Sequence, residues 1–275
     1  MERTITFDAG IRLCALGQGT WNMGKFPARR AEEIGALRTG IDLGLTVVDT
    51  AEMYENEELV GEAVRGCRDK VFLIDKVLPG NADYRGTKRA CERSLHKLGT
   101  DRIDLYLLHW KGPHPFSETL RAMLELRQEG KIRYWGVSNI DVPDMEHIRA
   151  LPGGDTCAAD QVLYNLKERG VEYDLVPWCA ERGMPVIAYS PIGEGSLAND
   201  GLLAEIAREH GATPARIALA WTMRHPGVMA IPKAGSAAHV RDNHRSLSIE
   251  LTEEDCRRLD AAFPAPEHKI PLAGW

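Results

Sequence analysis

Four side chains that could perform acid–base chemistry together stand at or just beyond the ends of three successive apolar runs. Asp49 lies near the end of LTVVDT, residues 45–50, and Tyr54 follows five residues later. Lys76 comes late in VFLIDKV, residues 71–77, and His109 comes late in IDLYLLHW, residues 103–110. A phenol can protonate a carbonyl oxygen, but with an ordinary pKa of about 10 it donates at neutral pH only if its anion is stabilised. The four residue types therefore point to protonation of a carbonyl by Tyr54.

The other three residues would support that tyrosine. An ammonium about 4 Å from the phenol contributes about 4 kcal/mol at an effective dielectric constant near 20, so we expect Lys76 to lower the pKa of Tyr54. Asp49 opposes this effect but keeps a partly buried Lys76 protonated, and His109 positions the substrate oxygen by a hydrogen bond. Taken singly, Asp49 could cap a turn, Lys76 could extend to a rim, and His109 could be a hydrogen-bonded core residue. Convergence of the four in one cleft is what indicates catalysis.

Eight apolar runs of strand length provide the elements that would position these residues. The runs occupy residues 13–20, 45–50, 71–77, 103–110, 132–139, 158–165, 185–191 and 227–233. Between them, apolar residues recur at helical spacing over 27–44, 55–66, 87–99, 117–130, 142–151, 174–183, 213–225 and 236–247. Buried strands that alternate with helices about every thirty residues are typical of parallel β/α units. The sequence predicts an α/β fold, a (β/α)8 TIM barrel whose strand ends share one mouth.

The remaining segments fit the same barrel. TITFDAGIRL, residues 4–13, predicts an N-terminal β-hairpin across the barrel floor with DAG as its turn, and residues 201–211 and 252–263 predict two extra helices. Residues 1–275 are expected to form a single barrel domain, for which about 250 residues are usual. A doubly wound dinucleotide-binding sheet would need G-x-G-x-x-G after the first strand. The chain instead has GQGTWNMG there, which lacks the third glycine and carries the bulky Trp21.

Charge and composition limit the partners. The net charge is -6, and Lys and Arg form no basic stripe, so nucleic acid is not expected as a partner. The N-terminus lacks a signal-peptide pattern and the apolar runs are only of strand length, which predicts a soluble, cytoplasmic protein without a membrane partner. Six scattered cysteines without a CxxC pair favour reduced thiols. A metal-dependent barrel hydrolase would need more ligands than His109 and His114, so no metal is expected.

The motifs around the four residues resemble those of the aldo-keto reductases over the whole chain. DTAEMY, IDKV and LLHW match the catalytic tetrad of that family, and GKIRYWGVSN, QVLYN, AYSP and IPK follow in the same order. DTAEMY, YDLVPWC and IPKA are similar to bacterial members of the methylglyoxal reductase type. The resemblance implies that Asp49, Tyr54, Lys76 and His109 are catalytic, and that hydride comes from a nicotinamide cofactor bound without a Rossmann motif.

The resemblance also implies where the cofactor lies. Ser138, Asn139 and Gln161 would hydrogen-bond its carboxamide, and Tyr189 would stack on the nicotinamide ring. The glycine-bearing loop SPIGEGSL would wrap the pyrophosphate with backbone N–H groups. Alternatively, Asn139 and Gln161 terminate strands and Tyr189 packs in the core. The complete predicted set is Gly19, Thr20, Trp21, Asp49, Ser138, Asn139, Gln161, Tyr189, Ser190, Pro191, Ile192, Gly193, Ser196, Leu197, Ile231, Lys233, Ala234, Ser236, His239 and Asn243.

The segment IPKAGSAAHVRDN, residues 231–243, resembles the one that binds the adenosine 2′-phosphate in this family. Lys233 would be the cation, and the N-terminus of the following helix would be the anion site. Ala234 stands where Ser or Thr is usual, and His239 stands where an Arg commonly contacts the 2′-phosphate. Loss of that permanent cation weakens the preference for a phosphorylated cofactor. We expect NADPH as the cofactor, with use of NADH also possible.

Apolar residues would wall the substrate pocket and exclude water from it: Trp21, Leu78, Pro79, Trp110 and Trp275, which would reach back from a C-terminal tail that is short for the family. They could instead be rim packing. The expected activity is NAD(P)H-dependent reduction of small aldehydes and ketoaldehydes, such as methylglyoxal-like compounds and aromatic aldehydes, without an obligate protein partner. Two alternatives are a cofactor-binding regulatory subunit of the potassium-channel β type and a reductase of a larger ketone, such as a keto sugar or ketosteroid.

Overall fold

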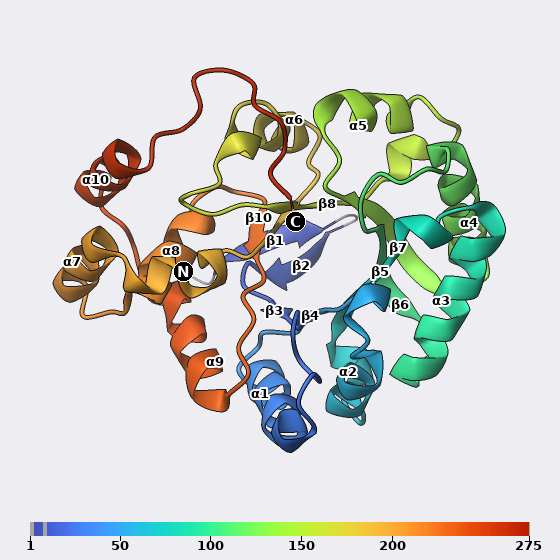
Figure 1. Ribbon diagram of the computed structural model, residues 1–275, viewed down its shortest axis with the longest axis horizontal. Coiled ribbons are helices and arrows are strands. Elements are labelled where there is room, and N and C mark those ends of the chain that lie inside the picture. Colours follow the sequence, from blue (N-terminus) through green and yellow to red (C-terminus); the bar gives the residue numbers. More distant parts are fainter. Residues whose placement is uncertain (1–2, 8–9, 275) are drawn as a thin grey trace.

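Eight parallel strands form the centre of the molecule. The computed structural model describes residues 3–7 and 10–274, and its strands are ordered β10-β9-β8-β7-β6-β5-β4-β3, so neighbours in sequence are neighbours in space (Figure 1). The strands are β3 (Gln18–Gly19), β4 (Val47–Asp49), β5 (Phe72–Val77), β6 (Ile103–Leu108), β7 (Ile132–Ser138), β8 (Asp160–Leu163), β9 (Val186–Tyr189) and β10 (Val228–Ala230). Each lies within the apolar run that predicted it, with shorter bounds.

The first and last strands of this sheet meet, which closes the barrel. Parallel bridges join Leu16 to Ala230 and Gly19 to Lys233, and we call this junction the barrel seam. A Cβ atom on Gly19 would lie 2.6 Å from the carbonyl oxygen of Ile231, well inside van der Waals contact. Position 19 therefore requires glycine. Eight parallel strands whose first and last members are joined by these bridges confirm the predicted TIM barrel.

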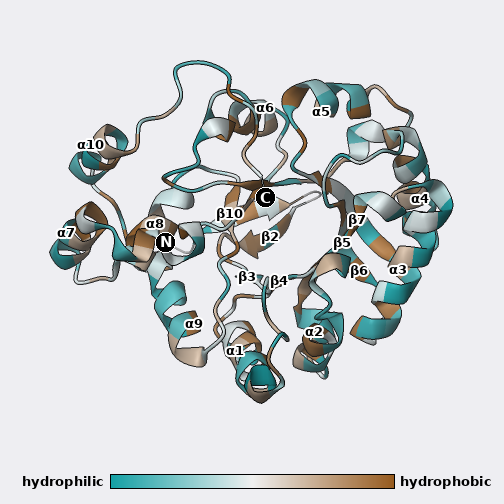
Figure 2. Cartoon of the chain, viewed as in Figure 1, coloured by the Kyte–Doolittle hydropathy of each residue, from teal (hydrophilic) through white to brown (hydrophobic). Residues whose placement is uncertain are grey.

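Helices surround the strands, and their outer faces are coloured mostly as hydrophilic residues (Figure 2). Those that alternate with strands are α1 (Arg30–Asp42), α2 (Glu57–Val64), α3 (Tyr84–Leu98), α4 (Phe116–Gln128), α5 (Val142–Arg149), α6 (Leu175–Glu181), α8 (Pro214–Thr222) and α9 (Ala237–His244), and the two predicted extra helices are α7 (Gly201–Glu209) and α10 (Glu253–Ala262). Helix α3 starts at Tyr84 rather than Thr87, because the Asp83 side chain caps it by accepting from two amides of the first turn. Within the described ranges, no helix is long and apolar enough to cross a membrane.

A two-stranded antiparallel hairpin covers the barrel floor, at the amino ends of the strands. Strand β1 (Thr4–Phe7) pairs with β2 (Ile11–Cys14). The ring centre of Phe7 lies 5.0 Å from the ring centre of Phe72, the first residue of β5, and 5.2 Å from the ring centre of Tyr134 in β7. The predicted hairpin is thus confirmed, while Asp8 and Ala9 of its predicted turn lie outside the described residues.

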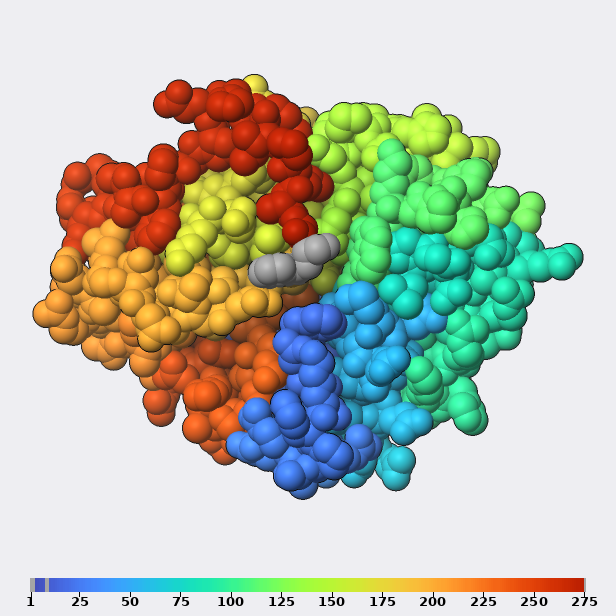
Figure 3. All heavy atoms as spheres, in the orientation of Figure 1, coloured from blue at the N-terminus to red at the C-terminus, as the bar shows by residue number. Residues whose placement is uncertain are grey.

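The chain after α10 runs from the rim to the centre of the opposite face (Figure 3). Lys269 fastens this tail, because its ammonium lies 2.5 Å from the carboxylate of Asp141 and 2.6 Å from that of Asp174, the residues that precede α5 and α6. Near the end of the tail, a Cβ on Gly274 would lie 4.0 Å from Oδ1 of Asn139. The tail therefore borders the barrel mouth. Trp275, a predicted pocket residue, lies outside the described residues.

Candidate active site

Three of the four predicted catalytic side chains touch one another inside the barrel mouth. Asp49 ends β4 opposite Ile74 of β5, and Lys76, two residues further along β5, points to the same interior side. The Lys76 ammonium donates to the Asp49 carboxylate at 2.8 Å, to the carbonyl of Thr50 at 2.8 Å and to the Tyr54 hydroxyl at 3.3 Å. Lys76 is 0% exposed. One buried cation therefore contacts both the carboxylate and the phenol.

A short turn presents Tyr54 to this cation. The 3-10 turn Glu52–Tyr54 follows the end of β4, and Glu55 ends it with a left-handed φ of 56°. The Glu52 carboxylate accepts from the amide of Leu78 at 3.0 Å and from the side chain of Asn81 at 2.8 Å. These contacts tie the turn to the loop that follows β5, the strand of Lys76. Glu52 could not be predicted from the sequence, since an acidic residue in a turn is an ordinary surface feature.

Burial dominates the electrostatics of the phenol. Burial raises the pKa of Tyr54, Lys76 lowers it, and the carboxylates of Asp49 and Asp75 raise it, so that the balance lies above the ordinary value. Lys76 thus has the expected lowering effect on the pKa of Tyr54, but desolvation outweighs one ammonium and leaves that pKa above its ordinary value. Although burial lowers the pKa of Lys76, Asp49 and Tyr54 raise it above the ordinary value. Asp49 thus has the expected effect of keeping Lys76 charged.

His109 is the neutral member of the group. Its ring centre lies 5.7 Å from that of Tyr54 and 4.8 Å from that of Trp110. Burial, followed by the ammonium of Lys76, lowers the pKa of His109 to about 2. Its Nδ1 atom has no hydrogen-bond partner among the described residues. A neutral imidazole, able to donate or accept a hydrogen bond, therefore stands beside the phenol at any pH near neutrality.

The residues predicted to hold a carboxamide converge on the same mouth. The amide of Gln161 donates to Oδ1 of Asp49 at 2.8 Å, which joins this group to the tetrad. Ser138 donates to the carbonyl of Gln161 at 2.8 Å. Asn139, with a left-handed φ of 57°, accepts from the hydroxyl of Tyr189 at 3.0 Å. Amide donors and acceptors and a half-buried aromatic ring thus lie together beside Asp49.

The loop after β9 is more self-contained than the sequence suggested. It winds through the 3-10 turns Gly193–Gly195 and Leu197–Asn199, with a left-handed φ of 48° at Ser190. Several of its amides already donate to carbonyls inside the loop, namely those of Gly193, Gly195, Ser196 and Leu197. Pro191 and Leu197 are buried, and Ile192 is half-buried. Ser196 is exposed, and Lys167, a residue absent from the predicted set, donates to its hydroxyl at 3.2 Å.

The predicted 2′-phosphate residues gather where the barrel seam meets α9. Lys233 is exposed and forms no ion pair with any described residue. Ser236 precedes α9, and its hydroxyl accepts from the amide of His239, whose side chain is exposed, at 3.4 Å. Among the first residues of this region, Ile231 and Ala234 are buried. Among the described residues of this segment, Lys233 and Arg241 are exposed without a counter-ion, and of these two only Lys233 belongs to the predicted set.

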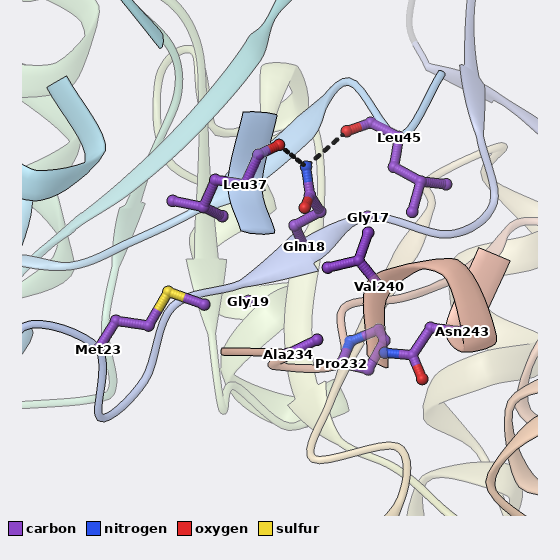
Figure 4. Close-up of a pocket in the computed structure, with 10 residues that line it drawn as sticks. All are labelled: Gly17, Gln18, Gly19, Met23, Leu37, Leu45, Pro232, Ala234, Val240 and Asn243. Atoms are coloured by element: carbon purple, nitrogen blue, oxygen red, sulfur yellow. Dashed lines mark hydrogen bonds between the residues drawn. The ribbon is translucent and has the colours of Figure 1, made fainter. Parts of the chain in front are cut away.

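A small cavity lies behind this region, lined by Gly19, Ala234 and Asn243 from the predicted set (Figure 4). Its volume is about 10 Å³, which holds one water molecule. Gln18 also lines it, with its amide nitrogen donating to the carbonyls of Leu37 and Leu45 and its Oε1 atom without a partner among the described residues. The cavity therefore suits a buried water that satisfies Gln18, and is too small for a nucleotide base.

Aromatic side chains rim the open mouth. Trp21 and Trp110 are 39% and 37% exposed, and the ring of Trp21 lies 4.9 Å from that of Tyr54. Leu78 is half-buried, while Pro79 is buried against the next loop, where a Cβ on Gly112 would lie 2.5 Å from the Pro79 Cβ. Beneath this rim, the hydroxyl of Thr20 donates to the carbonyl of Asp49 at 2.8 Å. The tetrad therefore has an accessible apolar border.

Arg29 is a further cation of this region that was not predicted from the sequence. A Cβ on Gly235 would lie 2.9 Å from Nη2 of Arg29 and 3.3 Å from Nζ of Lys233. Arg29 immediately precedes α1, and α1 packs beside α9 (Figure 1). No spacing along the sequence relates residue 29 to residue 235, so only the packed helices reveal this contact.

A parallel eight-stranded barrel with titratable groups at the carboxyl ends of its strands has the architecture of a barrel enzyme. The profile of the aldo/keto reductase family matches residues 15–263, and the chain belongs to this family of oxidoreductases. It is 50% identical over 279 residues to methylglyoxal reductase YeaE of Escherichia coli (strain K12), covering 98% of both chains. It is 31% identical to glyoxal reductase of Bacillus subtilis (strain 168), covering 95% of this chain and 93% of that one. The structure of an aldo-keto reductase from Klebsiella pneumoniae in complex with NADPH is 47% identical, with a TM-score of 0.97 and complete coverage of both chains.

Proposed function

We propose that this enzyme reduces small aldehydes and ketoaldehydes with NADPH, and that Tyr54 is the proton donor. The observation that carries the proposal is the buried ammonium of Lys76, which touches the Asp49 carboxylate and the Tyr54 hydroxyl at a mouth bordered by exposed indoles. A lysine with only a structural role in the core would need a carboxylate partner, but it would not need to contact a phenol at an accessible rim.

The chain's donor set fits a phosphorylated nicotinamide cofactor. Gln161 and Asn139 offer amide groups beside Asp49 for a carboxamide, and the half-buried ring of Tyr189 offers a stacking surface. Within the part of the chain that the structure describes, Lys233 has no counter-ion beside α9. When bound, the cofactor supplies hydride to the carbonyl carbon of the substrate. The proposal of NADPH is supported by the relative that was solved in complex with it.

The side chains then act on the carbonyl oxygen. Neutral His109 donates a hydrogen bond that orients this oxygen toward the Tyr54 hydroxyl. Tyr54 gives its proton to the oxygen as negative charge develops there, and it later regains a proton from solvent. Lys76 stabilises the resulting phenolate through its 3.3 Å contact, so its charge matters most in the transition state, when the phenol is losing its proton. Trp21 and Trp110 keep bulk water from the reacting atoms.

The substrate class follows from the mouth and from the relatives. The aromatic border and the tail fastened by Lys269 leave an entrance flanked by apolar rings, which suits a compact carbonyl compound. Relatives at 50% and 31% identity act, by their names, on methylglyoxal and glyoxal. We therefore place methylglyoxal-like ketoaldehydes and aromatic aldehydes first among the substrates.

The test is cofactor oxidation, followed by the absorbance of the reduced nicotinamide. NADPH and NADH are each combined with methylglyoxal, aromatic aldehydes, a keto sugar and a ketosteroid. We expect the highest kcat/KM with the small aldehydes and NADPH. Absence of turnover with every carbonyl would overturn the proposal, and turnover confined to the keto sugar or ketosteroid would replace the substrate class while keeping the reaction.

A further inference from the structure

Two cations that are far apart in the sequence meet over one glycine. The Arg29 guanidinium and the Lys233 ammonium both lie within 3.3 Å of the position that a Cβ of residue 235 would occupy. Among the described residues, Arg29 forms one ion pair, in which its Nε atom lies 3.6 Å from the carboxylate of Glu32. The two side chains are 46% and 52% exposed, and Nη2 of Arg29 has no carboxylate partner among these residues. Like charges held this close repel each other, and an anion placed between them removes the repulsion.

We infer that Arg29 binds the 2′-phosphate of NADPH together with Lys233, an inference that rests on the function proposed above. Because Gly235 has no side chain, the two cations can both lie over it, and Ser236, whose hydroxyl caps α9, stands next along the chain. A guanidinium offers paired N–H groups that match phosphate oxygens, whereas an ammonium acts as a point charge. Arg29 thus supplies, from the other side of the barrel seam, the permanent cation that His239 does not provide.

Arg29 is therefore a specificity residue for the phosphorylated cofactor. Calorimetric titration with NADP⁺, NAD⁺, adenosine 2′,5′-bisphosphate and 5′-AMP measures this without turnover. The Arg29→Met variant should bind NADP⁺ and the bisphosphate roughly tenfold more weakly, the lower end expected for hydrogen bonds to charged groups, because the site is exposed. Its affinity for NAD⁺ and 5′-AMP should stay within about twofold, and Arg29→Lys should fall between the variant and the wild type.

The next residue offers a matched control. Arg30 pairs with Glu62 of α2 at 2.9 Å, so its guanidinium points away from Gly235. The Arg30→Met variant makes the same change of charge one position along, and it should leave the ratio of NADP⁺ to NAD⁺ affinity unchanged.

A second variant moves Arg29 without removing its charge. In Gly235→Ala the new methyl group would lie 2.9 Å from Nη2 of Arg29, so this flexible side-chain end must shift. We expect weaker NADP⁺ binding with little change for NAD⁺. The methyl group would also lie 3.3 Å from Nζ of Lys233, so in the Arg29→Met background Gly235→Ala should have a smaller effect than in the wild type, limited to its contact with Lys233.

The outcomes separate the two proposals. A wild-type protein that binds neither NADP⁺ nor NAD⁺ overturns the proposed function itself. A wild-type protein that binds NADP⁺ while Arg29→Met weakens NADP⁺ and NAD⁺ equally, or while Arg30→Met matches Arg29→Met, overturns only the role of Arg29. Selective loss in Arg29→Met and Gly235→Ala supports it.

Discussion

Replacing Asp49 with asparagine removes the charge that faces Lys76 while keeping the shape of the side chain. At the observed separation of 2.8 Å the pair attracts by about 6 kcal/mol at an effective dielectric constant near 20. Removing one partner of a buried ion pair typically costs about 3–5 kcal/mol of unfolding free energy, because the other charge is left buried. We expect a loss in that range for Asp49→Asn at pH 7. Lys76, fully buried, then escapes the penalty by releasing its proton, so its pKa falls below the ordinary value.

This release predicts a reversed pH dependence. In the wild type the pKa of Lys76 is raised, so its contribution to stability is present below the ordinary lysine pKa and is lost only as pH rises through the raised value. In Asp49→Asn, Lys76 has a depressed pKa in the folded chain and its ordinary pKa in the unfolded chain. At pH values between the two, the unfolded chain therefore binds one more proton than the folded chain. The unfolding free energy of the variant should therefore increase by about 1.4 kcal/mol per pH unit across that interval, relative to the wild type.

Urea unfolding at several pH values between 6 and 9.5, followed by tryptophan fluorescence, measures both effects. Asp75→Asn is the control, since Asp75 is the buried neighbour of Lys76 in β5, and burial, together with Glu57, raises its pKa to about 8. Asp75 is mostly protonated at pH 7, and asparagine resembles the protonated acid without needing a proton to be taken up on folding, so this variant should be no less stable than the wild type at pH 7. Its pH dependence relative to the wild type should end near pH 8, whereas that of Asp49→Asn should continue toward the ordinary lysine pKa of about 10.4. An Asp49→Asn protein that is as stable as the control, or that shows no additional slope with pH, would refute the idea that Asp49 keeps Lys76 charged.

Three further predictions concern the site. Tyr54→Phe should lower kcat at least about a hundredfold while NADP⁺ affinity by calorimetry stays within about twofold, because the hydroxyl acts only on the carbonyl oxygen; activity within a few fold of the wild type would contradict the proton-donor role. His109→Gln, which keeps a neutral donor and acceptor, should retain more kcat/KM than His109→Leu, and equal loss in both variants would argue against a hydrogen bond to substrate. Because burial lowers the pKa of His109 to about 2, ionisation of His109 should not appear in the pH–rate profile between pH 5 and 8. His239→Arg should tighten NADPH more than NADH, and equal effects on both cofactors would place position 239 away from the 2′-phosphate.

The positions of the tetrad could be predicted because strand geometry is simple. Parallel strands bring their carboxyl ends to one face and alternate their side chains, so Asp49 and Lys76 had to share the mouth, and the turn carries Tyr54 to them. The direction of the Tyr54 pKa could not be predicted in the same way. It depends on how completely neighbouring side chains exclude water from the phenol, and those neighbours come from several strands and loops.

Contacts between distant segments were also beyond the sequence. Gln161 donates to Asp49 across 112 residues, and nothing in the QVLYN motif predicts that its amide reaches this carboxylate. Arg29 stands in an ordinary charged stretch before α1, where its neighbour Arg30 makes a simple surface ion pair. Only the packing of α1 beside α9 distinguishes the two arginines.

The barrel seam gives the proposed cofactor a second role. Arg29 precedes α1 and Lys233 follows β10, so the proposed phosphate site requires that the first and last barrel strands have already met. Binding there selects closed barrels over partly folded ones by mass action, and a ligand at a hundred times its Kd adds about 2.7 kcal/mol to the free energy of unfolding. Bound NADPH would then hold the first and last strands of the barrel together. The concentration of NADPH would affect the stability of the folded enzyme as well as its rate of turnover.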